Sequence, residues 1–468
     1  MAYVAYVTTL KNLRKHPNAD RLQLAECFGN TVCVSMEYVA DQVGVYFPTD
    51  GQLSMEFCEQ NGLLAVYVDG VNVSGGYMDA EKRNVKTIKL RGEKSDGLFL
   101  PLTCLAYTGV DIDTIKVGDT ISVVNGHEIC TKYIPKRNHK SHSNTSEGNR
   151  TRKKKVPVAP LFAEHADTEQ LAYNLSAFKP GDLVEITLKM HGTSQRTANL
   201  PRFDGYKRTL MDRILRREGV AQYNWGSVSG TRRVVLADFD GGYYGSNEFR
   251  EQHSKFFDGK LHKGETVYYE VVGFTTNGTP IMGDADNKKL NDKEFVKQYG
   301  KTTTFSYGCS PDGKKTFYGR DDQDNFEITK DVPQSDIYVY RMTMTNEDGD
   351  VVEYTPDFMR YRCEQMGVKT VPVLWYGLIP ENPGASYDDT ITAGEWIKNV
   401  AERFYDGPDP IGKTHVREGV VVRIINRPKF AAYKHKNFSF KVLEGIIKEV
   451  ADAPDMEEAQ DVADNGEE

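Results

Sequence analysis

A polar, basic segment from about Thr131 to Val158 divides this chain of 468 residues into two unequal parts. From Lys132 onwards it reads KYIPKRNHKSHSNTSEGNRTRKKKVPV, which has no periodic apolar face and is rich in Ser, Asn, Lys and Arg. Such a composition cannot bury enough apolar surface to form a core. We therefore expect a flexible basic linker at 131–158 with a folded module on each side.

The first module, 1–130, alternates short apolar runs such as YVAYV, TVCVSM, VGVYF and LAVYV with pieces that contain Asn, Asp, Gly and Pro. Runs of this kind predict short strands joined by turns. We expect a small β-barrel in this part of the chain.

The second module, 159–444, carries longer runs rich in β-branched and aromatic residues: LVEITLKM, TVYYEVVGF, DIYVYRMTM, VREGVVVRII and the segment around FSFKVL. These predict strands. Helical patterns lie between them at Lys207 to Arg217 and Pro356 to Met366. The fold class expected is α+β with antiparallel sheets. The last part, 445–468, is mostly acidic and predicts a disordered, solubilising tail.

Composition excludes several other classes. The net charge of −8 argues against a uniformly basic coat protein, although it averages over segments of opposite sign. The seven cysteines are scattered and never spaced as CxxC, which predicts reduced intracellular thiols and no zinc knuckle or disulfide framework. Because no leader pattern or membrane-length apolar run is found, we expect a soluble, cytoplasmic protein and no membrane partner.

The string that points to chemistry is Lys189-Met190-His191-Gly192-Thr193-Ser194, which follows the predicted strand Leu183 to Leu188. A KxxG pattern alone recurs by chance. Here it is followed, in order, by four further strings: Tyr268-Tyr269-Glu270, Ile337-Tyr338-Val339-Tyr340-Arg341, Arg417-Glu418-Gly419-Val420-Val421-Val422 and Lys434-His435-Lys436.

This ordered set resembles the motifs of the covalent nucleotidyltransferase superfamily of ligases and capping enzymes. The KxHGTS form of the first motif is most similar to nick-sealing RNA ligases that are ATP-dependent. In the first module, HPNADRL from His16 to Leu22 and RGEKSDGL from Arg91 to Leu98 resemble the OB-fold family used as tRNA-binding appendages by some aminoacyl-tRNA synthetases. The HPNAD string is also explained as a turn, since Pro fixes φ and Asn and Asp bond nearby backbone.

The resemblance implies an N-terminal OB-fold nucleic-acid-binding module and a nucleotidyltransferase domain. It also implies a reaction in three transfers, in which Lys189 attacks ATP, the AMP passes to an RNA 5′-phosphate, and a 3′-hydroxyl displaces AMP. A lysine amine attacks phosphorus only when it is unprotonated, so the pKa of Lys189 must be lowered by burial or nearby positive charge. Lys434 and Lys436 alternate on one strand, share a face, and are expected to supply that charge and to hold the phosphate.

Other residues have roles that the resemblance implies. Gly192 leaves room for the nucleotide. Glu270 is expected at the ribose and Glu418 at a Mg²⁺ or Mn²⁺ ion, because that kind of ion binds few carboxylates and keeps several waters. Tyr338 or Tyr340 is expected to stack on adenine. The remaining candidates are Arg196 and Arg232 for a 5′-phosphate, and Thr168 and Gln170, in the segment His165 to Gln170, for the nucleotide pocket.

Simpler interpretations remain open for these residues. Lysines and carboxylates on strands are often exposed charges, and arginines often form surface ion pairs. The two tyrosines alternate with Val339, so either of their faces could be core. The run Arg150 to Lys155 could neutralise RNA phosphates or act only as a solvated spacer.

The sequence also departs from the ligase pattern at three places. Leu188 stands where many ligases have glutamate, Tyr269 replaces a common glycine, and Ile337 occupies a possible base-stacking position. These departures leave the base of the nucleotide substrate, adenine or another, unsettled.

The alternative functions are a capping guanylyltransferase that uses GTP, a DNA ligase, and a non-catalytic RNA-binding protein. As an RNA ligase, the protein is expected to act in RNA repair and to have RNA ends as partners, in a nicked duplex or a tRNA.

Overall fold

The computed structural model describes residues 3–69, 71–133, 158–165, 168–215, 217, 219–232, 234–236, 239, 244, 247–320, 322–324, 326–384 and 391–450. The chain divides into two compact units. Unit 1 consists of Met1–Lys136, Lys288–Asp292 and Phe438–Asp452, and unit 2 of Arg137–Asn287, Lys293–Asn437 and Ala453–Glu468. Both are built on antiparallel strands with few helices, so the predicted α+β class is confirmed. The predicted linker and acidic tail lie almost entirely outside the described residues.

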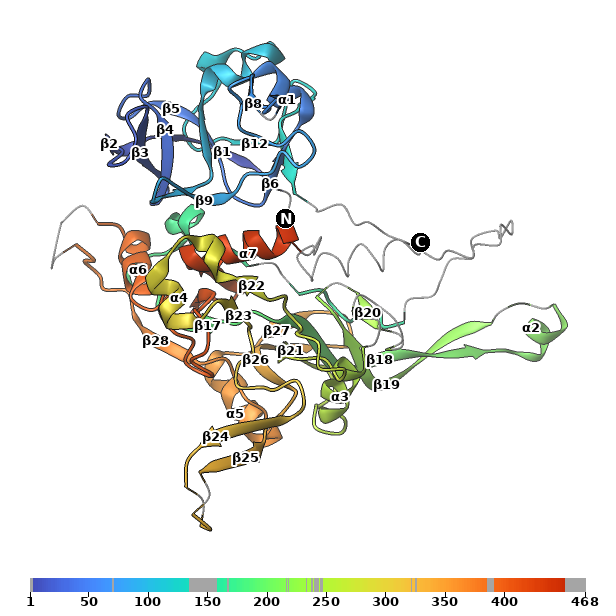
Figure 1. The fold of residues 1–468 in the computed structure, drawn as a ribbon. Helices are drawn as coiled ribbons and strands as arrows, with labels where there is room; N and C mark the ends of the chain where they lie inside the picture. Colours follow the sequence, from blue (N-terminus) through green and yellow to red (C-terminus); the bar gives the residue numbers. More distant parts are fainter. Residues whose placement is uncertain are drawn as a thin grey trace. The chain divides into compact units, whose positions relative to one another are not determined.

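Unit 1 is β-rich (Figure 1). A four-stranded sheet has the order β11-β5-β1-β12, and a three-stranded sheet has the order β2-β3-β4. The bounds are β1 Ala5–Thr9, β2 Lys11–Lys15, β3 Leu22–Cys27, β4 Asn30–Ser35, β5 Val43–Phe47, β11 Leu98–Pro101 and β12 Thr120–Ile121. Two-stranded pairs join β6 Gly51–Leu53 to β15 Cys130–Lys132, β7 Tyr67–Val68 to β8 Val71–Asn72, β9 Thr87–Leu90 to β10 Glu93–Asp96, and β13 Val123–Val124 to β14 His127–Glu128.

The expected closed barrel is not seen in these pairings, which form separate sheets in the part of unit 1 that the structure describes. The OB-fold assignment therefore stays a prediction. The two strings that suggested it do lie together: Nε2 of His16 is 3.1 Å from the carbonyl oxygen of Leu90, and the side-chain amide of Asn18 donates to the carbonyl of Arg91 at 3.0 Å. The HPNAD turn is thus packed against the β9–β10 turn.

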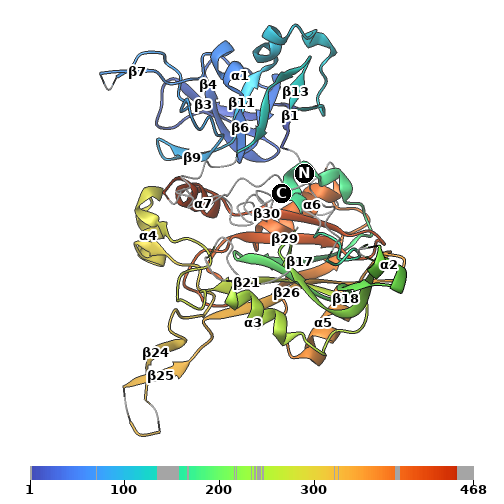
Figure 2. The same cartoon turned by 90° about the vertical axis from the view of Figure 1, so that its right-hand side faces the viewer.

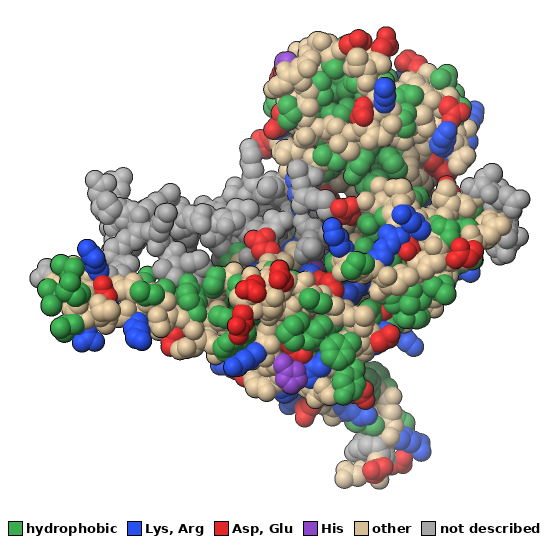
Figure 3. Space-filling view, turned by 180° about the vertical axis from the view of Figure 1, so that it is seen from behind, with side chains coloured by type: hydrophobic (Ala, Val, Ile, Leu, Met, Phe, Trp, Pro, Cys, Tyr) green, Lys and Arg blue, Asp and Glu red, His purple; other side chains and the backbone are tan. Residues whose placement is uncertain are grey.

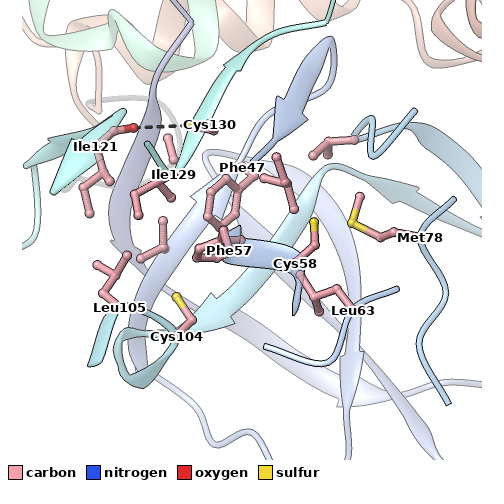
Figure 4. Packing of buried hydrophobic residues seen from close by; sticks show 14 of the residues in the cluster. Phe47, Phe57, Cys58, Leu63, Met78, Cys104, Leu105, Ile121, Ile129 and Cys130 are labelled. Atoms are coloured by element: carbon pink, nitrogen blue, oxygen red, sulfur yellow. Dashed lines mark hydrogen bonds between the residues drawn. The ribbon is translucent and has the colours of Figure 1, made fainter. Parts of the chain in front are cut away.

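The core of unit 1 is apolar and close-packed (Figure 4). The rings of Phe47 on β5 and Phe57 on α1 (Met55–Gln60) lie 5.4 Å apart, centroid to centroid. Leu63, Leu105 and Ile129 surround them and are almost completely buried. Full burial of such side chains stabilises a fold by about 1.5–3 kcal/mol each, so this cluster holds the short strands together.

The segment FSFKVL was predicted as a strand, and that prediction is wrong: it begins helix α7, Phe438–Val450. The full segment has apolar residues at Phe440, Leu443 and Ile447, a spacing of three and four that is helical. The helix belongs to unit 1, where Lys441 forms an ion pair with Asp96 at 2.5 Å. The predicted boundary at 444 therefore falls inside α7.

Unit 2 contains two larger sheets. The five-stranded sheet has the order β16-β30-β29-β17-β28 and the six-stranded sheet β20-β19-β18-β21-β26-β27. The bounds are β16 Glu169–Gln170, β17 Leu183–Lys189, β18 Thr193–Lys207, β19 Val220–Gly230, β20 Val235–Leu236, β21 Glu265–Gly273, β26 Ser335–Thr345, β27 Val351–Glu353, β28 Val373–Leu378, β29 Gly419–Ile424 and β30 Ala431–Lys436.

Helices cover one face of each sheet (Figure 2). Helix α6, Ala393–Glu402, buries Ile397 and Ala401 against the five-stranded sheet, and α3, Glu248–Phe256, and α5, Pro356–Met366, pack on the six-stranded sheet. The predicted helix Pro356 to Met366 is confirmed. The remaining elements are β22 Ala285–Asp286, β23 Thr302–Thr303, helix α4 Lys293–Tyr299, and the 3₁₀ turns Leu102–Thr108, Ile112–Thr114, Leu171–Tyr173, Leu175–Ala177 and Asn287–Leu290.

Two elements of unit 2 project from these sheets (Figures 1 and 2). The first is the long hairpin of β18 and β19 with the short helix α2, Leu210–Ile214, at its end. The helix predicted at Lys207 to Arg217 is therefore present but shorter. The second is the hairpin of β24, Lys314–Tyr318, and β25, Glu327–Asp331.

All seven cysteines lie in the described residues as free thiols. In the part of the chain that the structure describes, none of the helices is both long and apolar enough to span a bilayer.

A buried ion pair links α5 to β21 and predicts how stability depends on pH. Arg362 donates to both carboxylate oxygens of Glu265 at 2.8 Å, and the two side chains are 7% and 1% exposed. Burial alone would raise the pKa of Glu265, but hydrogen bonds from Arg362 and its neighbours lower it overall.

We expect Arg362→Met to lower the free energy of unfolding at pH 7 by about 3–5 kcal/mol, because it leaves a buried carboxylate without its cation. The stabilising effect of the lowered pKa is complete above the unfolded pKa of about 4.3 and is lost as pH falls through the native pKa. The difference between wild type and variant, measured by urea unfolding, should therefore shrink below about pH 4. The control is Lys255→Met on the exposed pair with Glu251, with an expected change under about 1 kcal/mol. A constant difference from pH 7 to pH 3 would contradict this account.

Candidate active site

Lys189 is the last residue of strand β17, which is buried on the face that packs beneath α6. Val184 and Ile186 are fully buried in the core beneath α6, and Lys189 points to the opposite face because side chains alternate along a strand. Lys189 is paired with Gly419 of β29, which is paired in turn with Lys436 of β30. Residues directly opposite one another share a face, so both lysine side chains lie on the same side of the sheet.

Glu418 joins the two lysines. Its Oε1 lies 2.7 Å from Nζ of Lys189 and 3.4 Å from Nζ of Lys436, and its Oε2 lies 3.5 Å from Nδ1 of His191. The Glu418 side chain is only 2% exposed, whereas that of Lys189 is 23% exposed. Local sequence does not require a buried carboxylate with two lysines beside it. The arrangement brings together the predicted nucleophile Lys189, the predicted metal ligand Glu418 and the predicted phosphate-binding Lys436.

The protonation of this cluster follows from these distances. Burial lowers the pKa of Lys189, and Lys436 lowers it further, but the Glu418 and Glu270 carboxylates outweigh both, so the net pKa is raised. Burial would raise the pKa of Glu418, but Lys189, Lys436 and His191 hold it well below its usual range. Lys189 is therefore a protonated amine in this arrangement. The low pKa expected for the nucleophile is not a property of the site as it stands.

Lys434 lies one step further along β30, opposite Val421 of β29 and beside Gln170 of β16. It is two residues from Lys436 and therefore on the same face of the strand. Gln170 is paired with Lys434 itself, at the edge of the sheet. Thr168 directly precedes β16.

The turn after Lys189 carries the chain from the five-stranded to the six-stranded sheet. Within it, the backbone N–H of Gly192 donates to Oε1 of Glu270 at 3.1 Å. A Cβ at Gly192 would lie 2.4 Å from the carbonyl oxygen of Val271 and 2.9 Å from Cγ of Glu270, so any other residue would force the strands apart. Glycine is required here by close contact with β21, and Glu270 anchors the turn.

Ile337, Tyr338 and Tyr340 of β26 are the candidates for stacking on the base, and they lie in different surroundings. Tyr338 is paired with Glu270 across β21 and β26, and the hydroxyl groups of Tyr340 and Ser194 are 2.9 Å apart. Ile337 is 6% exposed and belongs to the apolar core beneath α3 and α5. Of the three candidates, only the two tyrosines lie with the polar residues of the sheet.

Arg196 is placed differently from the expectation for a phosphate ligand. Its side chain is 1% exposed, stacks 4.0 Å from the ring centroid of Phe162, and donates to the backbone carbonyl oxygens of Phe162, Ala163 and Thr231. Those bonds tie the segment before the active site to the six-stranded sheet. Phosphate binding by Arg196 stays a prediction, since the guanidinium is engaged with backbone in this structure.

Arg232 follows β19, and its carbonyl accepts the backbone N–H of His165 at 3.0 Å. The His165 ring lies 5.2 Å from those of Tyr268 and Tyr340, and its Nδ1 is 3.0 Å from Nη1 of Arg341. Burial, followed by Arg341, Arg232 and Arg196, holds the pKa of His165 well below its usual value. His165 is therefore neutral and links Arg232 to the predicted base-stacking strand.

Sequence reasoning missed the residues that support the nucleophile turn from behind. The hydroxyl of Tyr307 accepts the backbone N–H of His191 at 2.7 Å, and the His191 ring packs edge-on against Phe305 at 4.5 Å. Tyr307 is 3% exposed and His415 packs against its ring at 4.6 Å. These contacts join residues more than a hundred positions apart, and no spacing in the sequence signals them.

No protein-family model matches the sequence, and no curated protein matches it. The fold is nevertheless similar to that of Naegleria gruberi RNA ligase. An apo variant of that enzyme has a TM-score of 0.52 at 16% identity, a variant with AMP and Mn has 0.51 at 15%, and the protein with PPi has 0.51 at 16%. Each comparison covers 96% of this chain and 99% of the other. The predicted resemblance to RNA ligases is thus confirmed at the level of the fold.

The ion pair predicts a change in the chemistry of Lys189. Because Glu418 raises the pKa of the amine, we expect Glu418→Gln to lower it and to let Lys189 lose its proton at a lower pH. Competitive labelling of lysines with acetic anhydride between pH 7 and 11, read by mass spectrometry, measures that midpoint. Glu251→Gln, which removes the partner of exposed Lys255, is the control and should leave Lys189 unchanged. An unaltered Lys189 midpoint in the Glu418 variant would contradict the electrostatic assignment.

Proposed function

We propose that this protein is an ATP-dependent RNA ligase that joins RNA 3′-hydroxyl and 5′-phosphate ends through a covalent lysyl-AMP. The observation that carries the proposal is the contact of Lys189 with Glu418 and of Glu418 with Lys436, three residues from three separate motifs. The fold shared with Naegleria gruberi RNA ligase, described with ATP and Mn and with PPi, supports it. An N-terminal OB-fold, RNA repair and a cytoplasmic location are part of the same proposal.

The first transfer forms a bond from Nζ of Lys189 to the α-phosphorus of ATP and breaks the bond to pyrophosphate. The amine must first lose a proton, so its ion pair with Glu418 has to be weakened when ATP binds. Lys436 and Lys434, on the same face as Lys189, would attract the phosphates and stabilise the negative charge that develops on them. In this proposal Glu270 holds the ribose, and Tyr338 or Tyr340 contacts the adenine.

The second transfer moves AMP from Lys189 to the 5′-phosphate of an RNA, which regenerates the amine. In the third, a 3′-hydroxyl attacks that phosphate, AMP leaves, and a phosphodiester forms. Arg232, beside neutral His165, remains a candidate for contact with the 5′-phosphate, with Arg196 as a buried support. Thr168 and Gln170 are proposed to border the nucleotide pocket.

The residues present fit a divalent cation. Glu418 is a buried, ionised carboxylate next to the proposed phosphate site. No group of three or more His, Cys, Asp or Glu residues is placed to hold a metal ion within the described ranges, which agrees with Mg²⁺ or Mn²⁺ bound by one carboxylate, water and phosphate oxygens. A cation at Glu418 would draw that charge away from Lys189 and favour the unprotonated amine.

The test is transfer of label from α-³²P-ATP to the protein in the presence of Mg²⁺. We expect a phosphoramidate, stable to base and labile to acid, that is absent in Lys189→Met and after chelation of the metal. Lys436→Ala should slow labelling by about 10²–10³-fold, because a positive charge is lost at the phosphate. Exposed Lys255→Ala is the control and should label like the wild type.

Pre-adenylylated RNA separates the later steps from the first one. Lys189→Met should still seal this RNA, since the amine is used only to load the AMP. In a separate competition experiment with the wild type, excess unlabelled GTP should not reduce labelling by ATP. Labelling that survives in Lys189→Met would refute the mechanism, and effective competition by GTP would favour a capping guanylyltransferase.

A further inference from the structure

The hairpin of β18 and β19 forms an arm that leaves the six-stranded sheet of unit 2. Strand β18 pairs with β21 from Thr193 to Ala198 and continues to pair with β19 as far as Lys207. The nine residues from Asn199 to Lys207 would extend about 30 Å at a rise of 3.3 Å per residue. We call residues 199–226 the arm; its free end carries helix α2 (Figure 1).

The arm is internally braced. The ring of Phe203 packs edge-on against those of Tyr206 and Tyr223, with centroids 5.2 Å and 6.0 Å away. At the tip, Thr209 and Asp212 form a capping box that begins α2. A two-stranded hairpin is only marginally stable alone, so these contacts help to keep the arm extended. The rings of Phe203 and Tyr223 are half-buried, and Tyr206 is 37% exposed.

The tip exposes aliphatic side chains. Helix α2 has no buried residue, and Leu210, Met211 and Ile214 are 74%, 65% and 67% exposed. Leu215 and Val220, which follow, are also exposed. Exposed apolar side chains are ordinary when scattered, but a group of five at the end of a projecting element marks a contact surface.

The arm is also basic. Residues 199–226 contain six Arg or Lys and three Asp or Glu, a net charge of 6 − 3 = +3 in a chain of net charge −8. Both described carboxylates of the arm are engaged within it, Asp212 in the capping box and Asp204 with Asn224. Figure 3 shows hydrophobic and basic side chains gathered at this end of the molecule. The described basic residues of the arm are Arg202, Lys207, Arg208, Arg213 and Arg217.

We propose that the arm binds the double-helical part of an RNA substrate, with its basic side chains on phosphates and the tip aliphatics in the minor groove. This rests on the proposed ligase function and specifies its substrate as duplex RNA. Positive charge complements the phosphate backbone. Leu, Ile and Met are side chains that minor-groove proteins press against base steps, and RNA duplexes present a wide, shallow minor groove that is recognised largely by shape.

The absence of aromatic side chains from Thr209 to Val220 distinguishes a duplex from a single strand as the occupant. Proteins that hold single strands offer aromatic faces on which bases stack. The other projecting hairpin has that character, because Tyr318 and Phe326 are 88% and 69% exposed. Strand β18 begins directly after Gly192, so a duplex held by the arm would be fixed with respect to Lys189.

Two double variants test the proposal: Arg213→Glu with Arg217→Glu, and Met211→Ser with Ile214→Ser. All four side chains are exposed, so neither variant should disturb the fold. The control is Lys255→Glu, a single charge reversal at an exposed lysine of α3 that lies outside the arm. The Kd for a nicked RNA duplex and for a single strand of equal length is measured against salt concentration.

We expect the charge variant to reduce the slope of log Kd against log salt by about 1.4–1.8, because each of the two lost phosphate contacts contributes about 0.7–0.9. The serine variant should raise the Kd for the duplex by about tenfold through lost apolar contact and leave that for the single strand unchanged. Both variants should label with ATP like the wild type, and the defect in sealing should appear in KM rather than kcat.

Duplex affinity equal to wild type in both variants, or an equal loss for single strands, would overturn the proposal. So would sedimentation that shows a wild-type dimer and a monomeric serine variant with normal RNA affinity, because the tip would then be a protein interface. If the wild type does not label with ATP, the ligase function fails, whereas the duplex affinities still decide the role of the arm.

Discussion

The buried ion pair between Lys189 and Glu418 is the interaction on which the candidate site depends. It joins the end of β17 to the residue that precedes β29, and through Lys436 it reaches β30. A carboxylate that is 2% exposed cannot stay ionised without such partners. The position of the Lys189 amine is therefore set by charge pairing as much as by the strand that carries it.

The same pair sets the protonation of Lys189. Because the Glu418 carboxylate raises the pKa of Lys189, the amine is protonated in this structure. The turn that follows is held separately, by Glu270 on the N–H of Gly192 and by Tyr307 on the N–H of His191. Protonation of the amine can thus change while the backbone around it stays in place.

The predictions that succeeded were local. Runs rich in β-branched and aromatic residues predicted β17, β21, β26 and β29 close to their observed bounds, and a helical pattern predicted the helix at Pro356 to Met366. FSFKVL failed because six residues with two aromatics fit a strand, whereas the helical spacing becomes clear only over the longer segment to Val450. Arg196 illustrates a second limit, since its carbonyl partners Phe162 and Thr231 lie more than thirty positions away.

By itself, the sequence determined the chemical groups of the site and their order along the chain, because motifs, strand periodicity and charge are local properties of the residues. Only the tertiary structure decided that α7 belongs to unit 1 and that Tyr307 supports the turn after Lys189. It also decided that Ile337 belongs to the apolar cluster beneath α3 and α5, whereas Tyr338, although equally buried, faces Glu270. The physical reason is that strand pairing and side-chain burial depend on contacts between distant segments, which local pattern does not specify.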